Sequence, residues 1–159
     1  NLALWFRELY PDLAVGAVGS SGPVMAQLDF YGYLTVVEDN FRQYDRMYKK
    51  DCAGRVSAAF DEIEQKMEDP KGREYITRLL DVYPYLEDAI SDQNSITLFY
   101  LYTIIPLMTI SQYDGMDFLT MFCDRLTNTT GWPDPLEGFA ASLTMKTADD
   151  MASNTYWRT

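Results

Sequence analysis

The chain has 159 residues and a net charge of −11, from 13 lysine and arginine residues against 24 aspartate and glutamate residues. This length predicts one domain, and the negative charge argues against nucleic acid and anionic membranes as partners, because both require a clustered positive field. There is no histidine, which excludes a Ser-His-Asp or Cys-His catalytic set built from this chain alone and removes the commonest zinc ligand, so we expect no metal and no cofactor.

The first ten residues predict an amphipathic helix that Pro11 ends. Asn1 would be either the N-cap of this helix or an interior residue of a longer one. Since no basic segment precedes the apolar residues, we do not expect a signal peptide here. Four apolar side chains share one face of the predicted helix: Leu2, Trp5, Phe6 and Leu9.

The apolar run 13–18 predicts a short strand buried on both faces, followed by a loop rich in glycine and serine. We find no second strand in the sequence, and one strand cannot satisfy its own backbone groups. We therefore expect its partner strands outside these 159 residues, the alternative being that 13–18 is a buried loop. The segment 16–22 has neither phosphate-loop nor nucleophile-elbow spacing, so it predicts a tight turn.

From Asp29 onward the sequence predicts helices separated by short breaks. Asp29 is the expected N-cap of a helix that extends through Phe41, and Ser95 that of the apolar stretch 96–110. With Pro106 inside it, this stretch is too short and too interrupted to span a bilayer, so we expect a central, buried, kinked helix. The other predicted helices cover 52–68, 71–81, 118–126 and 136–143, with breaks at Asp69-Pro70, Tyr83-Pro84, Tyr113-Asp114-Gly115 and 132–135.

The basic residues between 42 and 50 predict a solvated helix face whose members form ion pairs with nearby aspartates. The cations are Arg42, Arg46, Lys49 and Lys50, and the aspartates are Asp39, Asp45 and Asp51.

Two further features depend on the cellular compartment. Asn128-Thr129-Thr130 is an N-glycosylation sequon in a polar connection between predicted helices. Cys52 and Cys123 would be buried thiols in a reducing compartment. In a secretory compartment they would be oxidised, either with each other or with cysteines elsewhere, and the sequence leaves the pairing open.

Residues 1–38 carry a pattern found in a family of serine peptidases. This stretch resembles the family that includes lysosomal Pro-X carboxypeptidase, dipeptidyl peptidase II and thymus-specific serine protease, and most closely the thymus-specific branch. The resemblance rests on Asn1–Arg7, Tyr10–Leu13, Gly16–Val24, Asp29-Phe30, Tyr33 and Val36-Val37, with shorter matches at Cys52, Gln112–Asp114, Cys123-Asp124 and Leu126–Asn128.

The resemblance implies a mostly α chain, the helical cap of an α/β-hydrolase. Residues 1–23 would be a fragment of the hydrolase core, namely the nucleophile helix and the following strand, and residues 24–159 a cap of about five or six helices. The nucleophilic serine would lie four residues before Asn1, and the aspartate and histidine beyond Thr159. The chain would then contain no catalytic residue and would be inactive alone.

The resemblance also implies a lysosomal or secreted serine exopeptidase that acts on peptides after proline or small residues, with the cap restricting access. A homodimer of the parent enzyme is possible within this family. The position of Asn1 lines the primary specificity pocket of Pro-X carboxypeptidase, where it is methionine, so asparagine would make the pocket more polar. The expected substrate-binding residues are Asn1, Ser20, Ser21 and Gly22.

Two other functions are compatible with the composition. One is a stand-alone acidic helical module that binds a protein partner in a groove. The other is a helical carrier with a ligand pocket among the aromatic residues around 98–122. The module predicts that residues 1–20 are covered internally, whereas a peptidase fragment predicts an exposed apolar patch formed by the first helix and 13–18.

Overall fold

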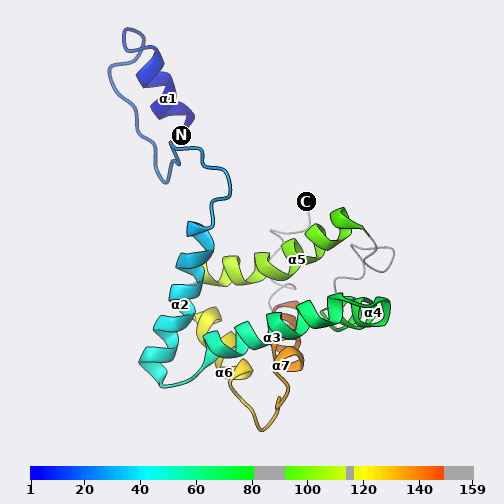
Figure 1. The fold of residues 1–159 in the computed structure, drawn as a ribbon. Coiled ribbons are helices and arrows are strands. Elements are labelled where there is room, and N and C mark those ends of the chain that lie inside the picture. The colour runs from blue at the N-terminus through cyan, green and yellow to red at the C-terminus, as the bar shows by residue number, and fades with distance from the viewer. Residues whose placement is uncertain (81–91, 114–116, 149–159) are drawn as a thin grey trace. The chain divides into compact units, whose positions relative to one another are not determined.

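The computed structural model describes residues 1–80, 92–113 and 117–148, and within them the chain forms seven helices and no strand. The chain divides into a first unit, Asn1–Gly32, and a second unit, Tyr33–Thr159 (Figure 1). The predicted boundary between a core fragment, 1–23, and a cap, 24–159, stays a prediction. The helices are α1 (Leu2–Leu9), α2 (Gly32–Tyr48), α3 (Cys52–Met67), α4 (Pro70–Leu79), α5 (Gln93–Gln112), α6 (Asp117–Leu126) and α7 (Pro135–Ala148).

The first unit contains α1 and an irregular segment. Asn1 caps α1, because its side-chain oxygen accepts a hydrogen bond from the Leu2 amide at 2.8 Å. The helix ends at Leu9, where the Tyr10 amide still donates to the Phe6 carbonyl and Pro11 follows. The predicted first helix is therefore confirmed.

The predicted strand over 13–18 is wrong. These residues form no strand, and Leu13, Val15 and Val18 are exposed. A strand exists only through hydrogen bonds to a neighbouring strand, and the described part of the chain supplies none. The alternative of a buried loop is wrong as well, because none of residues 1–32 is buried.

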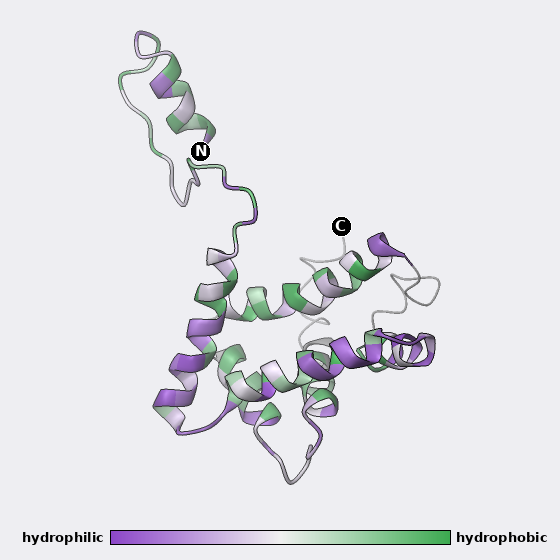
Figure 2. Cartoon of the chain, viewed as in Figure 1, coloured by the Kyte–Doolittle hydropathy of each residue, from purple (hydrophilic) through white to green (hydrophobic). Residues whose placement is uncertain are grey.

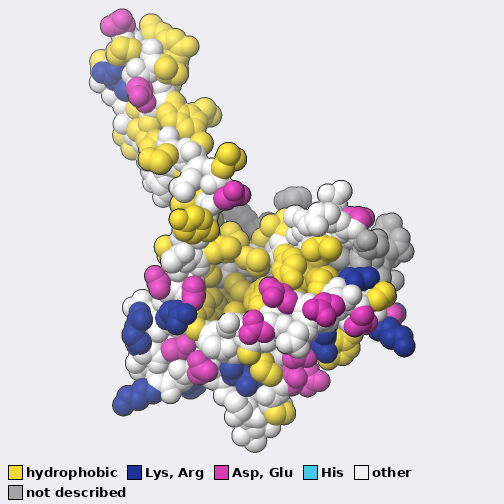
Figure 3. Space-filling view, viewed as in Figure 1, with side chains coloured by type: hydrophobic (Ala, Val, Ile, Leu, Met, Phe, Trp, Pro, Cys, Tyr) yellow, Lys and Arg dark blue, Asp and Glu magenta, His cyan; other side chains and the backbone are white. Residues whose placement is uncertain are grey.

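Apolar side chains are exposed along the whole first unit, and they include Leu2, Phe6 and Leu9 of α1. Figures 2 and 3 show hydrophobic residues over this unit. Within the first unit itself, the apolar face of α1 is therefore not covered by residues 10–32.

The second unit is built around α3, which packs against α4, α6 and α7. Phe122 of α6 lies between Phe41 of α2 and Phe139 of α7, with edge-to-face rings whose centroids are 5.9 and 6.0 Å apart. Such aromatic pairs add stability beyond the area they bury. The largest fully buried side chains of this core include Ile63, Ile76, Phe99, Leu126, Leu136 and Phe139.

The predicted helix over 52–68 is confirmed as α3, and the helix predicted over 71–81 is α4, which begins at Pro70 and ends at Leu79. Asp69 separates them and caps α4, accepting hydrogen bonds from the Lys71 and Gly72 amides at 2.9 and 3.0 Å. Pro70 occupies the first turn of α4, where its missing N–H costs nothing. The predicted breaks at Tyr83-Pro84 and Asp114-Gly115 lie outside the described residues.

Two predicted N-caps are misplaced. Asp29 has a φ of 49°, in the left-handed region, and α2 begins three residues later at Gly32. An N-cap residue requires a different backbone conformation, so Asp29 belongs to the turn before the helix. Ser95 lies inside α5, where its hydroxyl completes a capping box with the true N-cap, Asp92.

The expectation that the apolar helix is central and buried is also wrong. The prediction that this stretch is too short and too interrupted to span a bilayer is wrong as well, because α5 is one continuous helix of 20 residues that contains Pro106. Within the described residues α5 is the one helix long and apolar enough to cross a membrane, although core helices satisfy the same criterion. Only 22% of its apolar window is buried. Phe99, Thr103, Leu107 and Ile110 form the packed face, whereas Leu98, Leu101 and Ile105 are exposed. A uniformly apolar sequence does not specify which face packs.

Candidate functional site

The predicted substrate-binding residues lie in the first unit. Asn1 begins α1, and Gly22 lies beside it: a Cβ atom at Gly22 would stand 2.8 Å from the Asn1 backbone nitrogen. A glycine is therefore required for this close approach. The Trp5 indole of α1 donates a hydrogen bond to the Val24 carbonyl at 3.3 Å, which ties the segment just after Gly22 to α1.

Ser20 and Ser21 form the turn that leads into Gly22, and both are exposed. Ser21 has a φ of 48°, an unusual conformation for a residue with a side chain. Such strain is concentrated at functional sites, although tight turns also require it. The structure thus brings Asn1 and Gly22 together and places the two serines on the adjoining turn.

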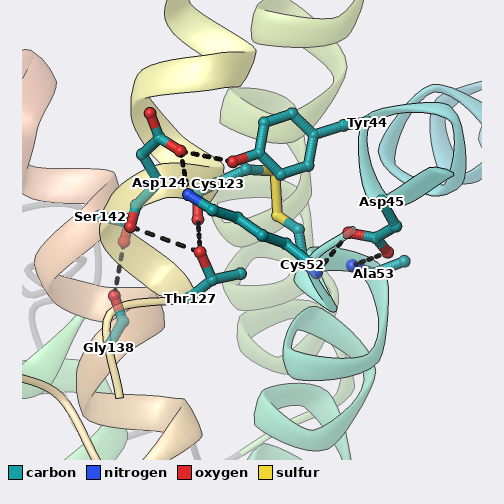
Figure 4. Close-up of a disulfide and its surroundings, with 10 residues drawn as sticks. Tyr44, Asp45, Cys52, Ala53, Cys123, Asp124, Thr127, Gly138 and Ser142 are labelled. Atoms are coloured by element: carbon teal, nitrogen blue, oxygen red, sulfur yellow. Dashed lines mark hydrogen bonds and ion pairs between the residues drawn. A yellow bond between two sulfur atoms is a disulfide. The ribbon is translucent and has the colours of Figure 1, made fainter. Parts of the chain in front are cut away.

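A second cluster surrounds the disulfide between Cys52 and Cys123, shown in Figure 4. The bond joins the first residue of α3 to α6, with Cα atoms 5.3 Å apart, and both cysteines are fully buried. The sequence left open whether these cysteines pair with each other or with cysteines elsewhere, and in the structure they pair with each other.

Three polar side chains beside the disulfide join α2 to α6. The Tyr44 hydroxyl donates a hydrogen bond to the Asp124 carboxylate at 2.6 Å (Figure 4). Lys50 forms an ion pair with the same carboxylate. Burial, followed by the bond to Asp124, raises the pKa of Tyr44 to about 12. The Lys50 ammonium, followed by the Tyr44 hydroxyl, lowers the pKa of Asp124. Tyr44 stays protonated at neutral pH, so the cluster holds helices together and offers no nucleophile.

The predicted basic face forms different ion pairs from those expected. Arg42 pairs with Glu38 one helical turn away, and Lys50 pairs with Asp124. Asp45 instead accepts hydrogen bonds from the amides of Cys52 and Ala53 at 2.6 and 3.0 Å. The sequence could not indicate the partner of Lys50, because Asp124 follows it by 74 residues.

The connection between α6 and α7 is held by Arg55 of α3. One guanidinium nitrogen donates to the carbonyls of Trp132 and Asp134, at 2.7 and 3.2 Å. The Asp134 carboxylate accepts from the Glu137 amide at 2.8 Å, which caps α7. The sequence does not indicate this role of Arg55, because an isolated arginine on a helix gives no signal of a distant partner.

An apolar groove opens where α2, α3 and α5 meet, and Figure 3 shows it as a hollow lined by hydrophobic side chains. Its volume is about 200 Å³. A second hollow, of about 220 Å³ between α2, α5 and α6, includes Ile110, Ser111 and Leu119 from the region expected to hold a carried ligand. The residues lining the first groove include Leu34, Val37, Phe41, Val56, Phe60 and Leu107.

Among the described residues, no group of three histidine, cysteine, aspartate or glutamate side chains is placed to hold a metal ion. The described part of the chain is a helical unit with one internal disulfide, together with a turn of glycine and serine residues beside Asn1.

Comparison with known proteins gives the family. Residues 1–156 match the family described as serine carboxypeptidase S28, and the chain belongs to this family. Two Caenorhabditis elegans proteins, each carrying the name "Putative serine protease", are 32% identical, over 99% and 79% of this chain. Human thymus-specific serine protease is 37% identical over 42% of it.

The chain spans less than a third of each of these relatives: 31% and 23% of the two nematode proteins and 13% of the human one. No solved structure matches it. The predicted resemblance to this family of serine peptidases is confirmed, including the similarity to the thymus-specific branch.

Proposed function

We propose that the chain is part of a serine-type exopeptidase related to Pro-X carboxypeptidase and dipeptidyl peptidase II, and that residues 24–159 form its helical cap. The family match over residues 1–156 carries the proposal. The exposed apolar face of α1 supports it, because a nucleophile helix of a hydrolase core would pack that face against strands.

The proposed chemistry is acyl transfer by groups outside these residues. A serine four residues before Asn1 would attack the peptide carbonyl, and a histidine beyond Thr159 would accept and return the proton. This chain has no histidine of its own. It would contribute the helix behind the nucleophile, the turn at the specificity pocket and the cap.

We propose Asn1, Ser20, Ser21 and Gly22 as residues at the mouth of the specificity pocket. Their support is the close approach of Gly22 to the Asn1 backbone, which places the turn beside the start of α1. An amide at Asn1 makes the pocket more polar than methionine would, so we expect a weak preference for proline. Replacing Asn1 with methionine should raise kcat/KM for a proline substrate relative to an alanine substrate.

The experiment for the reaction class uses the complete protein that contains this chain. A fluorophosphonate probe should label one serine, located four residues before Asn1, and replacing that serine with alanine should abolish both labelling and peptide hydrolysis. Peptides blocked at one end only would distinguish carboxypeptidase from dipeptidyl peptidase action. Hydrolysis that survives the serine-to-alanine change would contradict the proposal.

We further propose a lysosomal or secreted location, a peptide substrate and a homodimer for the complete enzyme. The buried disulfide supports the location, because such bonds persist in oxidising compartments and are rare in the cytosol. Fractionation of cells that express the complete protein would test the location. A cytosolic protein with free thiols would contradict it.

A further inference from the structure

We infer that Asn128 carries an N-linked glycan, an inference that rests on the proposed secretory location and adds a modification site to it. The triplet Asn128-Thr129-Thr130 is the only sequence of the type Asn-X-Ser/Thr in the 159 residues. A triplet alone is weak, so the inference depends on where the structure places it.

The triplet lies in the connection between α6 and α7, and its three residues are all exposed. The Asn128 carbonyl accepts hydrogen bonds from the Gly131 and Trp132 amides at 3.1 and 2.9 Å, which closes a turn. The Asn128 side chain, which would be bonded to the sugar, therefore lies on a surface turn and contributes nothing to the core. A bulky polar group there would displace no packed side chain.

The space beside the acceptor nitrogen is kept open by a glycine. A Cβ atom at Gly131 would stand 3.2 Å from the Asn128 side-chain nitrogen, Nδ2, which is tighter than ordinary contact. Glycine at this position leaves room around the atom that would be bonded to the sugar.

Hydrogen bonds from the neighbouring helices also hold the two ends of the turn. Arg55 binds the Trp132 carbonyl at 2.7 Å, and the Thr127 hydroxyl donates to the Cys123 carbonyl at 2.7 Å. A glycan on Asn128 would therefore extend from a turn that is anchored to the helical unit.

The disulfide that supports the proposed secretory location also lies close to the sequon in the sequence. Cys123 lies five residues before Asn128 and forms a buried disulfide with Cys52. Disulfide formation and N-glycosylation both take place in the secretory pathway. The proposed secretory location would therefore bring the chain into the compartment where both reactions occur.

The modification joins Nδ2 of Asn128 to the anomeric carbon of an oligosaccharide. The donor is a lipid-linked diphosphate oligosaccharide: the bond between its anomeric carbon and phosphate oxygen breaks, the lipid diphosphate leaves, and the amide gives up one proton.

Within the second unit, the turn lies on the side of α3 away from α5 (Figure 1). The sugar would leave the exposed apolar face of α5 uncovered.

The test uses the complete protein expressed in eukaryotic cells and purified from the secretory fraction. Peptide-N-glycosidase F should lower the mass of the peptide that contains residue 128 and convert the asparagine to aspartate. Asn128→Gln and Thr130→Ala should abolish this shift. Thr129→Ala is the matched control, because it changes the adjacent threonine and leaves the sequon intact, and Thr130→Ser should also retain the glycan.

A disulfide-bonded protein from the secretory fraction with no sugar at residue 128 would overturn the inference, as would a Thr130→Ala protein that keeps the shift. Either result would leave the proposed peptidase function untouched, since that depends on labelling of the serine. Free thiols and a cytosolic location would instead overturn the proposed compartment, and the glycan with it.

Discussion

The carboxylate of Asp45, in α2, accepts hydrogen bonds from the backbone amides of Cys52 and Ala53 at 2.6 and 3.0 Å. It therefore caps α3 from the preceding helix. Asp51, the residue at the N-cap position, makes no such bond with its side chain. The same contact fixes the backbone of Cys52, from which the disulfide extends to α6.

Replacing Asp45 with alanine should therefore destabilise the protein by about 1–2 kcal/mol, the range for loss of a capping side chain. Asp51→Ala is the matched control and should change the free energy of unfolding by less than about 0.5 kcal/mol. Urea unfolding of both variants checks this. Equal losses for the two variants would show that Asp45 is not the cap.

The disulfide should contribute substantially to stability, because it closes a loop between residues separated by 71 positions. A loop of this length corresponds to about 4 kcal/mol in the chain-entropy model. The double variant C52A/C123A should lose about that much free energy of unfolding in denaturant titration. Met121→Ala, at an exposed position on the same helix, should lose much less. Equal unfolding midpoints for wild type and the double variant would contradict this expectation.

The buried hydroxyl of Tyr44 should make stability sensitive to alkaline pH. Its pKa is raised to about 12 in the folded protein, chiefly by burial, against about 10 when unfolded. Stability from this group is complete below pH 10 and is lost as the pH rises towards 12, because the unfolded state releases its proton first. Thermal unfolding between pH 9 and 12 should show a smaller decline for Tyr44→Phe than for wild type. Tyr48→Phe, at an exposed position, is the control and should decline as wild type does.

The carboxylate of Asp124 should make the stability of the protein decrease as the pH falls in the acid range. Its pKa is lowered, first by the hydrogen bond from Lys50 and then by that from Tyr44. The stabilisation is present above the unfolded pKa, near 4, and is lost as the pH falls through the lower folded value. Lys50→Met should flatten the loss of stability below pH 4 in acid titrations followed by circular dichroism. An unchanged acid slope in this variant would show that the ion pair does not bias the titration.

The two faces of α5 should respond differently to substitution. Phe99 is fully buried, so Phe99→Ala should cost about 3–5 kcal/mol of stability. Leu101 is 48% exposed, so Leu101→Ala should cost far less in the same unfolding measurement. A comparable loss at Leu101 would show that this face is covered by another part of the complete protein.

Most of the helices could be predicted from local pattern. The periodicity of apolar residues located α1, α3, α4, α6 and α7, because contacts between residues three and four positions apart lie within each helix. The N-caps of α2 and α5 were predicted wrongly, because more than one residue near the start of each helix is a suitable N-cap. Asp29 and Ser95 are both good N-cap residues, and only the backbone around them decides that α2 begins at Gly32 and α5 at Gln93.

The strand predicted over 13–18 failed for a different reason. An apolar run indicates burial but does not supply the neighbour against which a strand forms. In the described residues no neighbouring strand exists, and Val15 is fully exposed. The candidate site was partly predictable: the resemblance indicated Asn1 and Gly22, whereas their direct contact appears only in the structure.

The sequence by itself determined the family, the helical content and the absence of a histidine, because these follow from local pattern and composition. The tertiary structure alone decided that Cys52 bonds to Cys123, that Lys50 pairs with Asp124 and that one face of α5 is left exposed. The two pairings join residues more than 70 positions apart, and the exposed face depends on which helices lie against α5. Both are properties of packing, which no single segment of the sequence contains.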